Sequence, residues 1–147
     1  MGRIKGPAIF LAQFLREEEP FNTLSGLAKW VADLGYKAVQ IPTWDRRTID
    51  LEKAAESQTY CDEYKGLLGQ FGLEVSELGA HLQGQVLAIH PAYEMMFEAF
   101  HPKGLRGQAR TRWATDQLEK AVCASARLGT RTVPVLSGGF AWHMAYP

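Results

Sequence analysis

A histidine and two glutamines stand close together after an apolar stretch near the middle of the chain. Residues 74–80 read Glu-Val-Ser-Glu-Leu-Gly-Ala, and His81, Gln83 and Gln85 follow at alternate positions. A neutral imidazole can ligate a metal ion or move a proton, and amides can hydrogen-bond the hydroxyls of a ligand. The pattern indicates a short buried strand that runs out into a polar loop with the groups of a binding site. On these residues alone, a strand-end histidine bonded to a backbone carbonyl is an equally good interpretation.

A second group of polar residues follows another apolar stretch. Residues 36–41 predict a strand that Pro42 ends, and Trp44, Asp45 and Arg46 come soon after it. An indole ring can wall a sugar pocket, and a guanidinium can hold a phosphate or a carboxylate. For Asp45 we favour a structural role, in which an aspartate–arginine pair pins a solvated loop. Trp44 and Arg46 are therefore candidate substrate-binding residues.

The elements that must position these groups can be read from the spacing of apolar residues. A continuous apolar run at residues 8–13 is typical of a strand buried on both faces. A long connection over residues 82–107 has room for a short helix at 92–99. The full pattern predicts strands over residues 8–13, 36–41, 74–80 and 132–136 and helices over residues 24–34, 55–71 and 108–128.

The three predicted helices end in the same way. Each ends in an apolar residue followed by a glycine, at Leu34-Gly35, Phe71-Gly72 and Leu128-Gly129, and a strand is expected two residues later. Glycine after a helix takes the left-handed conformation that stops it. A connection this short places the start of the strand beside the end of its helix, as in a β-α-β crossover, and such crossovers join parallel strands. The repeat therefore predicts a parallel α/β fold.

The loops favour one kind of parallel fold. No glycine-rich dinucleotide or P-loop motif follows a predicted strand. The strand-to-helix loops are long and polar and the helix-to-strand loops are tight, which suits a (β/α)8 TIM barrel with its active site at the carboxyl ends of the strands. Such a barrel takes about 250 residues. We therefore expect this chain of 147 residues to be the N-terminal half of a single barrel domain, with four strands and three helices.

Three segments resemble a known family. They are Gly-Pro-Ala-Ile-Phe-Leu-Ala-Gln-Phe at residues 6–14, Val-Gln-Ile-Pro-Thr-Trp-Asp-Arg at 39–46 and Ala-His-Leu-Gln-Gly-Gln at 80–85. The chain resembles the sugar phosphate isomerase/epimerase family, of the xylose isomerase-like TIM-barrel superfamily, over nearly its whole length. The resemblance implies that fold and a reaction that isomerises an aldose and a ketose, or epimerises a carbon next to a carbonyl. Strand-end position and motif together favour His81 and Gln83 as substrate-binding residues, beside Trp44 and Arg46.

The resemblance also implies a divalent metal ion, namely Mn, Mg, Co or Zn. Such an ion would hold the carbonyl and hydroxyl oxygens of the sugar as a Lewis acid while a carboxylate moves a proton. The family's metal-binding Glu, Asp and His residues lie on later strands than those predicted here. We therefore name no metal ligand and no catalytic residue, and expect this chain alone to bind metal weakly and to be inactive.

The composition restricts the alternatives. The 16 Lys and Arg residues balance the 16 Asp and Glu residues, so the basic excess of a nucleic-acid binder is absent and an endonuclease IV-like repair enzyme is disfavoured. A truncated, non-catalytic barrel that acts as an interaction module stays open. Cys61 and Cys123 have no CxxC spacing, and no apolar run approaches the about 20 residues of a membrane span, so we expect a cytoplasmic protein with reduced thiols. Its expected partners are a sugar or sugar phosphate and either a second copy or the missing half of the barrel.

Overall fold

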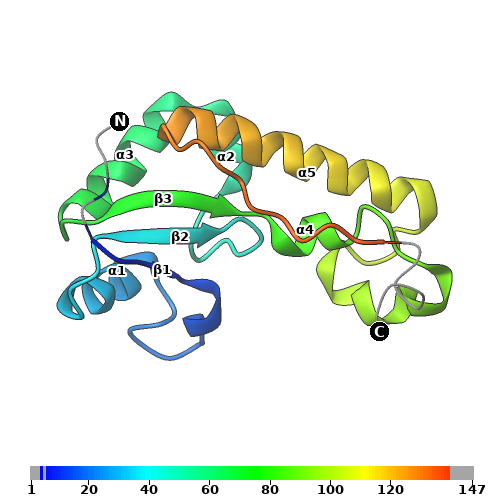
Figure 1. Cartoon of the computed structure of the whole chain (residues 1–147), viewed down its shortest axis with the longest axis horizontal. Coiled ribbons are helices and arrows are strands. Elements are labelled where there is room, and N and C mark those ends of the chain that lie inside the picture. The colour runs from blue at the N-terminus through cyan, green and yellow to red at the C-terminus, as the bar shows by residue number, and fades with distance from the viewer. Residues whose placement is uncertain (1–3, 5, 140–147) are drawn as a thin grey trace.

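The computed structural model describes residues 4 and 6–139, which form a mixed α/β fold. Its sheet has three strands in chain order, β1 (Ala8–Phe10), β2 (Ala38–Pro42) and β3 (Glu74–Gly79), as Figure 1 shows. Both neighbouring pairs run parallel. The predicted parallel α/β class is therefore confirmed.

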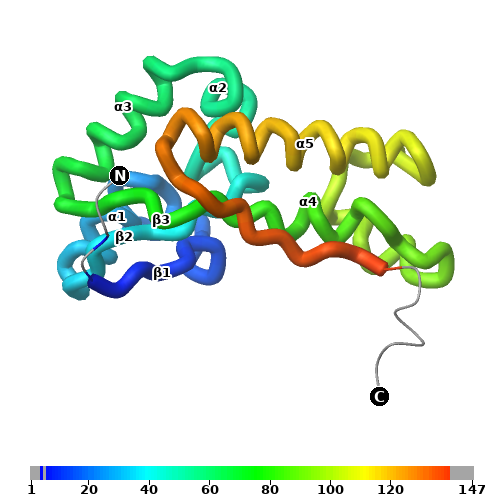
Figure 2. Tube along the Cα trace, turned by 45° about the horizontal axis from the view of Figure 1, so that its top comes forward, coloured from blue at the N-terminus to red at the C-terminus, as the bar shows by residue number. Residues whose placement is uncertain are grey.

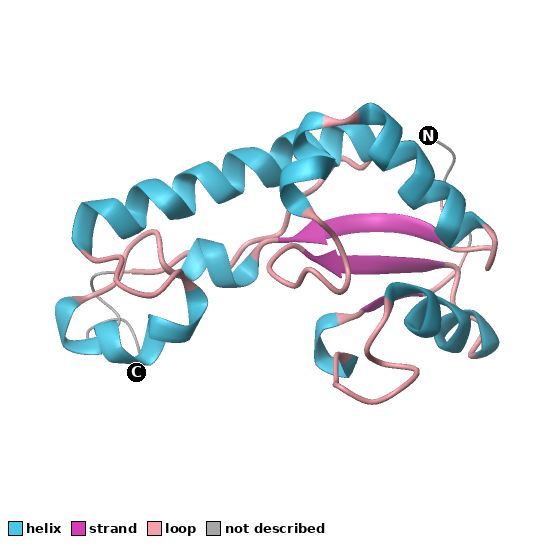
Figure 3. Ribbon diagram, turned by 180° about the vertical axis from the view of Figure 1, so that it is seen from behind, coloured by secondary structure: helices cyan, strands magenta, loops and turns pink. Residues whose placement is uncertain are grey.

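Helices connect the strands and extend the molecule beyond the sheet. Figure 3 shows the longest of them, α5, running over the sheet at one end and over the short helices that follow β3 at the other. None of the helices in the described part of the chain has both the length and the hydropathy of a membrane span. The helical elements are η1 (Ala12–Phe14), α1 (Leu24–Asp33), α2 (Leu51–Glu56), α3 (Gln58–Gly69), α4 (His81–Gln85), η2 (Pro91–Phe100) and α5 (Gly107–Leu128), where η denotes a 3-10 helix.

The two faces of the sheet differ in burial. Val39 and Ile41 of the central strand lie in the main core, which helix residues complete. Because side chains alternate along a strand, Gln40 points to the opposite face, where its register partners are Phe10 and Glu77. These three side chains are only half-buried. The face of the sheet away from the core is thus the more open one, and it carries polar groups.

A smaller core holds the segment after β3 against α5. Val86, Ile89, Phe97 and Ala114 are its buried members, and Trp113 packs against them. Figure 2 shows how this segment folds back beneath the N-terminal part of α5. The helix therefore braces two clusters at once, one over the sheet and one beyond the ends of the strands.

The helix ends follow the predicted pattern. The three glycines expected to stop helices have positive φ, at +88° for Gly35, +69° for Gly72 and +79° for Gly129. Thr23 caps α1, because its side chain accepts a hydrogen bond from the backbone N–H of Gly26. The helix-to-strand corners into β2 and β3 are confirmed.

The predicted helix over residues 55–71 is wrong in its extent, because the structure divides this region into α2 and α3. Ser57 has an extended backbone, with φ −119° and ψ 117°, and its hydroxyl caps α3 at the N–H of Tyr60. Asp50 caps α2 at the N–H of Lys53, so that helix begins inside the stretch expected to be a loop. Side-chain caps compete with helix continuation at both places.

The predicted strand over residues 132–136 is also wrong. The segment runs beside the end of β3 and along α4 (Figure 1). The carbonyl of its Pro134 accepts a hydrogen bond from the backbone N–H of Ala80, 2.9 Å. Pro134 has no N–H and cannot extend a ladder. Val135 and Leu136 are exposed. The described residues therefore contain three strands, not four.

Two smaller expectations need correction. β1 is an edge strand that ends at Phe10, and Ala8 is exposed, so this strand is not buried on both faces. The stretch that begins at His81 is the helix α4 and not an open polar loop. Its Gly84 lies against the 132–136 region, since a Cβ on this glycine would be 2.8 Å from the carbonyl oxygen of Leu136.

This close approach yields a paired prediction. Gly84→Ala should lower the free energy of unfolding by about 1–3 kcal/mol, because the added methyl group overpacks against backbone. Gly66→Ala, at a position of α3 where no atom apart from chain neighbours and the helix's own backbone lies within 4 Å of the new Cβ, should raise it by about 0.5–1 kcal/mol through helix propensity. Urea unfolding of both variants checks this, and a stabilised Gly84→Ala protein would contradict the packing of α4 described above.

Candidate functional site

Three rings meet at the carboxyl ends of the three strands. Phe10 is the last residue of β1, Trp44 follows β2 and His81 follows β3. The ring centroids are 6.0 Å apart for Phe10 and Trp44, 5.4 Å for Phe10 and His81, and 6.0 Å for Trp44 and His81. All three side chains are half-buried. We call Phe10, Trp44 and His81 the aromatic cluster.

Gly79 makes this closure possible. A Cβ on Gly79 would lie 3.3 Å from Nε2 of His81 and 3.4 Å from Cε2 of Phe10. The bare backbone at the end of β3 therefore lets two of the rings close over it.

The cluster contains an unused polar atom. Nδ1 of His81 is buried and has no hydrogen-bond partner in the described part of the chain. Buried polar atoms are nearly always paired, so an unpaired one needs an explanation, and a ligand is one. On the same face of the sheet lie Gln40 and Glu77, and Glu77 accepts a hydrogen bond from the hydroxyl of Thr132, 3.1 Å. This face thus offers an imidazole, an amide and a carboxylate.

A clamp holds the loop that carries Trp44. Arg47 donates to both carboxylate oxygens of Asp45, with Nη2–Oδ2 at 2.7 Å, and it also reaches Glu17 and the carbonyl of Arg16 in the loop after β1. The hydrogen bonds from Arg47 lower the pKa of Asp45 and outweigh the raising effect of burial. The predicted aspartate–arginine pair is confirmed, with Arg47 as the arginine. It ties the loop after β2 to the loop after β1.

A cavity of about 270 Å³ opens on another side of Trp44. Of the four residues predicted to bind substrate, Trp44, Arg46 and Gln83 line it and His81 does not. Arg46 is exposed, whereas Gln83 is 2% exposed. The structure therefore brings Trp44 and His81 together in the aromatic cluster, and Trp44, Arg46 and Gln83 together in this cavity. The complete lining is Thr43, Trp44, Arg46, Ile49, Asp50, Leu51, Glu52, Leu82, Gln83, Ala99, Phe100, His101, Pro102, Trp113 and Gln117.

Several of the residues that line the cavity were not predicted to bind a ligand. Phe100 and His101 come from the end of η2, and Trp113 and Gln117 come from α5. They reach the cavity because η2 packs against α5 through the smaller core. The spacing of residues in the sequence does not predict that these side chains come together, because their proximity depends on a contact between two helices.

The residues described here do not by themselves fit the metal centre that the family resemblance implies. Among residues 4 and 6–139, no group of three or more His, Cys, Asp or Glu side chains lies close enough to hold an ion. A tight site needs several preplaced ligands of these types. The expectation of weak metal binding by this chain stays a prediction.

The comparisons with known proteins locate a distant structural neighbour. No protein-family model and no curated protein matches the chain. Among solved structures, the D-psicose 3-epimerase with D-tagatose from Clostridium cellulolyticum H10 is similar to it, with a TM-score of 0.37 and 13% sequence identity. The match covers 89% of this chain and 51% of that chain. The chain thus spans about half the length of this epimerase.

The clamp predicts how stability responds to acid. The pKa of Asp45 is lower in the folded than in the unfolded chain, so its carboxylate stabilises the fold above the ordinary pKa of about 3.9. Asp45→Asn should lower the free energy of unfolding at neutral pH by about 1 kcal/mol, allowing for solvent screening. The difference from the parent should shrink as the pH falls below about 4.

Denaturant unfolding at several pH values measures this difference. Asp33→Asn is a matched control, because Asp33 pairs with Lys29 on the exposed face of α1, 2.7 Å, without tying two loops together. It should change stability by about 0.5 kcal/mol or less. An Asp45→Asn effect that stays constant from neutral to acid pH would contradict the clamp.

Proposed function

We propose that this chain is part of a sugar or sugar-phosphate isomerase or epimerase, with the aromatic cluster as a wall of the substrate site. The observation that carries the proposal is the meeting of Phe10, Trp44 and His81 at the ends of three successive parallel strands. Ligands of parallel α/β folds bind at the carboxyl ends of the strands. Each of the three segments that resemble the sugar phosphate isomerase/epimerase family supplies one of these rings.

The chemistry of the open sheet face agrees with this proposal. Aromatic rings cover the C–H faces of a sugar, and the half-buried imidazole of His81 can bond a hydroxyl or carbonyl oxygen. Isomerisation and epimerisation next to a carbonyl both require a group that takes up a proton and returns it. Glu77, near the carboxyl end of β3, is a carboxylate on this face. We assign it to proton transfer within the proposal.

We further propose that the three strands belong to a (β/α)8 barrel of the xylose isomerase-like type. Tight helix-to-strand corners, parallel pairing in chain order and an open, partly polar sheet face support it. The outer edge of β1 has no strand beside it in the described part of the chain. In a closed barrel every edge is paired. The metal that the resemblance implies would need ligands from outside the described residues.

The unpaired edge predicts self-association of the isolated 147-residue chain. Light scattering over a range of concentrations should show dimers or larger species, because unpaired backbone groups and the half-buried Ile9 and Phe10 invite a second copy. Ala8→Lys places a charge on the exposed edge residue and should weaken the association. A cooperative monomer at high concentration would contradict the barrel proposal.

The role of His81 has a direct test. In the polypeptide that carries this sequence at full length, His81→Phe keeps a ring against Phe10 and Trp44 but removes both nitrogens. It should lower kcat/KM about tenfold, because the substrate oxygen loses the hydrogen bond proposed for the imidazole. Exchange of solvent deuterium into the carbon next to the carbonyl of ketoses and ketose phosphates, followed by NMR, measures this.

A packing variant separates chemistry from structure. His81→Ala removes ring and nitrogens together, so it should lower both turnover and the melting temperature, whereas His81→Phe should leave the melting temperature near that of the parent. Full turnover by His81→Phe would exclude the imidazole from the reaction. Failure of both variants to fold would show that His81 is structural and would also count against the proposal.

A further inference from the structure

We propose that the cavity lined by Trp44, Arg46 and Gln83 is a second ligand site, distinct from the aromatic cluster, for a small hydroxylated molecule with one anionic group. The inference does not depend on the proposed reaction. It follows from the free polar groups, the charge and the aromatic walls that α4, η2, α5 and the loop after β2 bring together there.

Gln83 supplies a buried amide with a free end. The hydroxyl of Thr43 lies 3.3 Å from Oε1 of Gln83 and 3.1 Å from the carbonyl of Gly79. Since that hydroxyl has a single hydrogen, it bonds one of them at a time, and at most one end of the amide is occupied. The amide nitrogen makes no hydrogen bond within the described part of the chain. Gln83 is 2% exposed, lines the cavity and keeps an amide group that no described residue bonds. It is therefore placed to bind a ligand.

His101 adds a second polar group of the same kind. It is 8% exposed, and its Nδ1 lies 3.0 Å from the carbonyl oxygen of Pro102. A carbonyl can only accept, so Nδ1 carries the proton of that bond, and Nε2 is an acceptor whenever the ring is neutral. Nε2 makes no hydrogen bond among the described residues. Together with Gln83, the cavity presents both a donor and an acceptor, and a hydroxyl group satisfies either one.

Arg46 is the cation at the cavity that has no carboxylate partner among the described residues. Asp50 pairs with Lys53, 3.7 Å, and Glu52 shares Lys120 with Asp116, each at 2.8 Å. Arg46 is exposed and forms no ion pair with the described residues. Its guanidinium can therefore take a carboxylate or phosphate of the ligand through paired hydrogen bonds. This feature argues for an anionic molecule over a neutral one.

The walls and the size of the cavity define the rest of the ligand. Trp44, Phe100 and Trp113 contribute aromatic surface, which packs against the C–H groups of a polyol. A volume of about 270 Å³ lies just below the 300–1,000 Å³ range of ordinary small-molecule pockets. A six-carbon sugar acid has the size, the hydroxyls and the single charge that this cavity matches.

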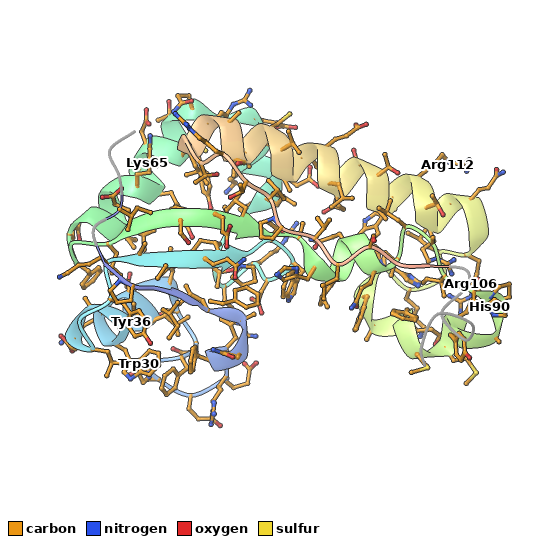
Figure 4. The ribbon with its side chains drawn as sticks, viewed as in Figure 1. Trp30, Tyr36, Lys65, His90, Arg106 and Arg112 are labelled. Carbon is orange, nitrogen blue, oxygen red and sulfur yellow. The ribbon has the colours of Figure 1, made fainter. Side chains whose placement is uncertain are left out.

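The test uses D-gluconate and the neutral polyol D-glucitol as probes on the full 147-residue chain. Gluconate should shift the indole N–H resonances of Trp44 and Trp113 saturably in NMR spectra, while Trp30, which lies on α1 (Figure 4), stays unshifted as an internal reference. Glucitol should bind about tenfold more weakly, because it lacks the charged hydrogen bond to Arg46.

Variants assign the binding to this cavity. Arg46→Gln changes an exposed residue, so it should not disturb folding. It should weaken the binding of gluconate about tenfold and leave the binding of glucitol unchanged. Gln83→Met should weaken both probes. Arg112→Gln is the matched control, since Arg112 is an exposed arginine of α5 outside the cavity lining (Figure 4), and it should bind both probes like the parent.

Three results would overturn the inference. One is the absence of any shift of Trp44 and Trp113 at saturating gluconate. Another is equal affinity for gluconate and glucitol, which would remove the role of Arg46. The third is a loss of binding that follows His81→Phe and not Arg46→Gln, because it would place the probe at the aromatic cluster.

Discussion

Both groups of candidate residues depend on the hydrogen bonds that join Thr43 to Gly79. The carbonyl of Gly79 accepts from the backbone N–H of Thr43 at 3.0 Å and lies 3.1 Å from its hydroxyl. These contacts fix the end of β2 against the end of β3. Trp44 is the next residue after Thr43, and His81 follows two residues after Gly79. The distance between the indole and the imidazole is therefore set by backbone pairing and not by the rings alone.

The neighbouring loops are held from two further directions. Arg47 ties the loop after β2 to the loop after β1 through Asp45 and Glu17. On the far side, the Ala80 N–H bonds the carbonyl of Pro134, so the chain that leaves α5 covers the start of α4. Each strand end is thus restrained by contacts that come from distant parts of the sequence. Such restraint is what a binding site needs, because side chains on free loops would spread.

Local signals in the sequence were enough to predict the parallel sheet and its corners. A glycine after an apolar helix end acts within a few residues, and Gly35 and Gly72 both have the expected left-handed backbone. The same signal at Gly129 is not followed by a strand. A strand must pair with a neighbour through its backbone, and Pro134 has no N–H to donate. The end of α2 at Ser57 also depends on local residues, but the sequence does not predict it. A serine can either continue a helix or cap the next one.

The candidate site shows a subtler limit of sequence reasoning. His81 and Gln83 are two residues apart, and on a strand their side chains would share a face. In the structure they belong to α4, where each residue turns by about 100° and two residues by about 200°. They therefore point to nearly opposite sides, His81 to the aromatic cluster and Gln83 to the cavity. One helical turn after β3 is what separates the two sites.

Trp44 is the residue that connects them, because its ring touches His81 and Phe10 and its side chain also lines the cavity. A ligand bound at either place would contact the same indole. If each of the two ligands has a preferred orientation of that ring, each changes the affinity for the other, and linkage requires the effect to be equal in both directions. The loop that carries Trp44 is clamped by Arg47, so its backbone is restrained and the indole side chain is the part that is left to reorient. Among the described residues, Trp44 is the side chain that the aromatic cluster shares with the cavity lining.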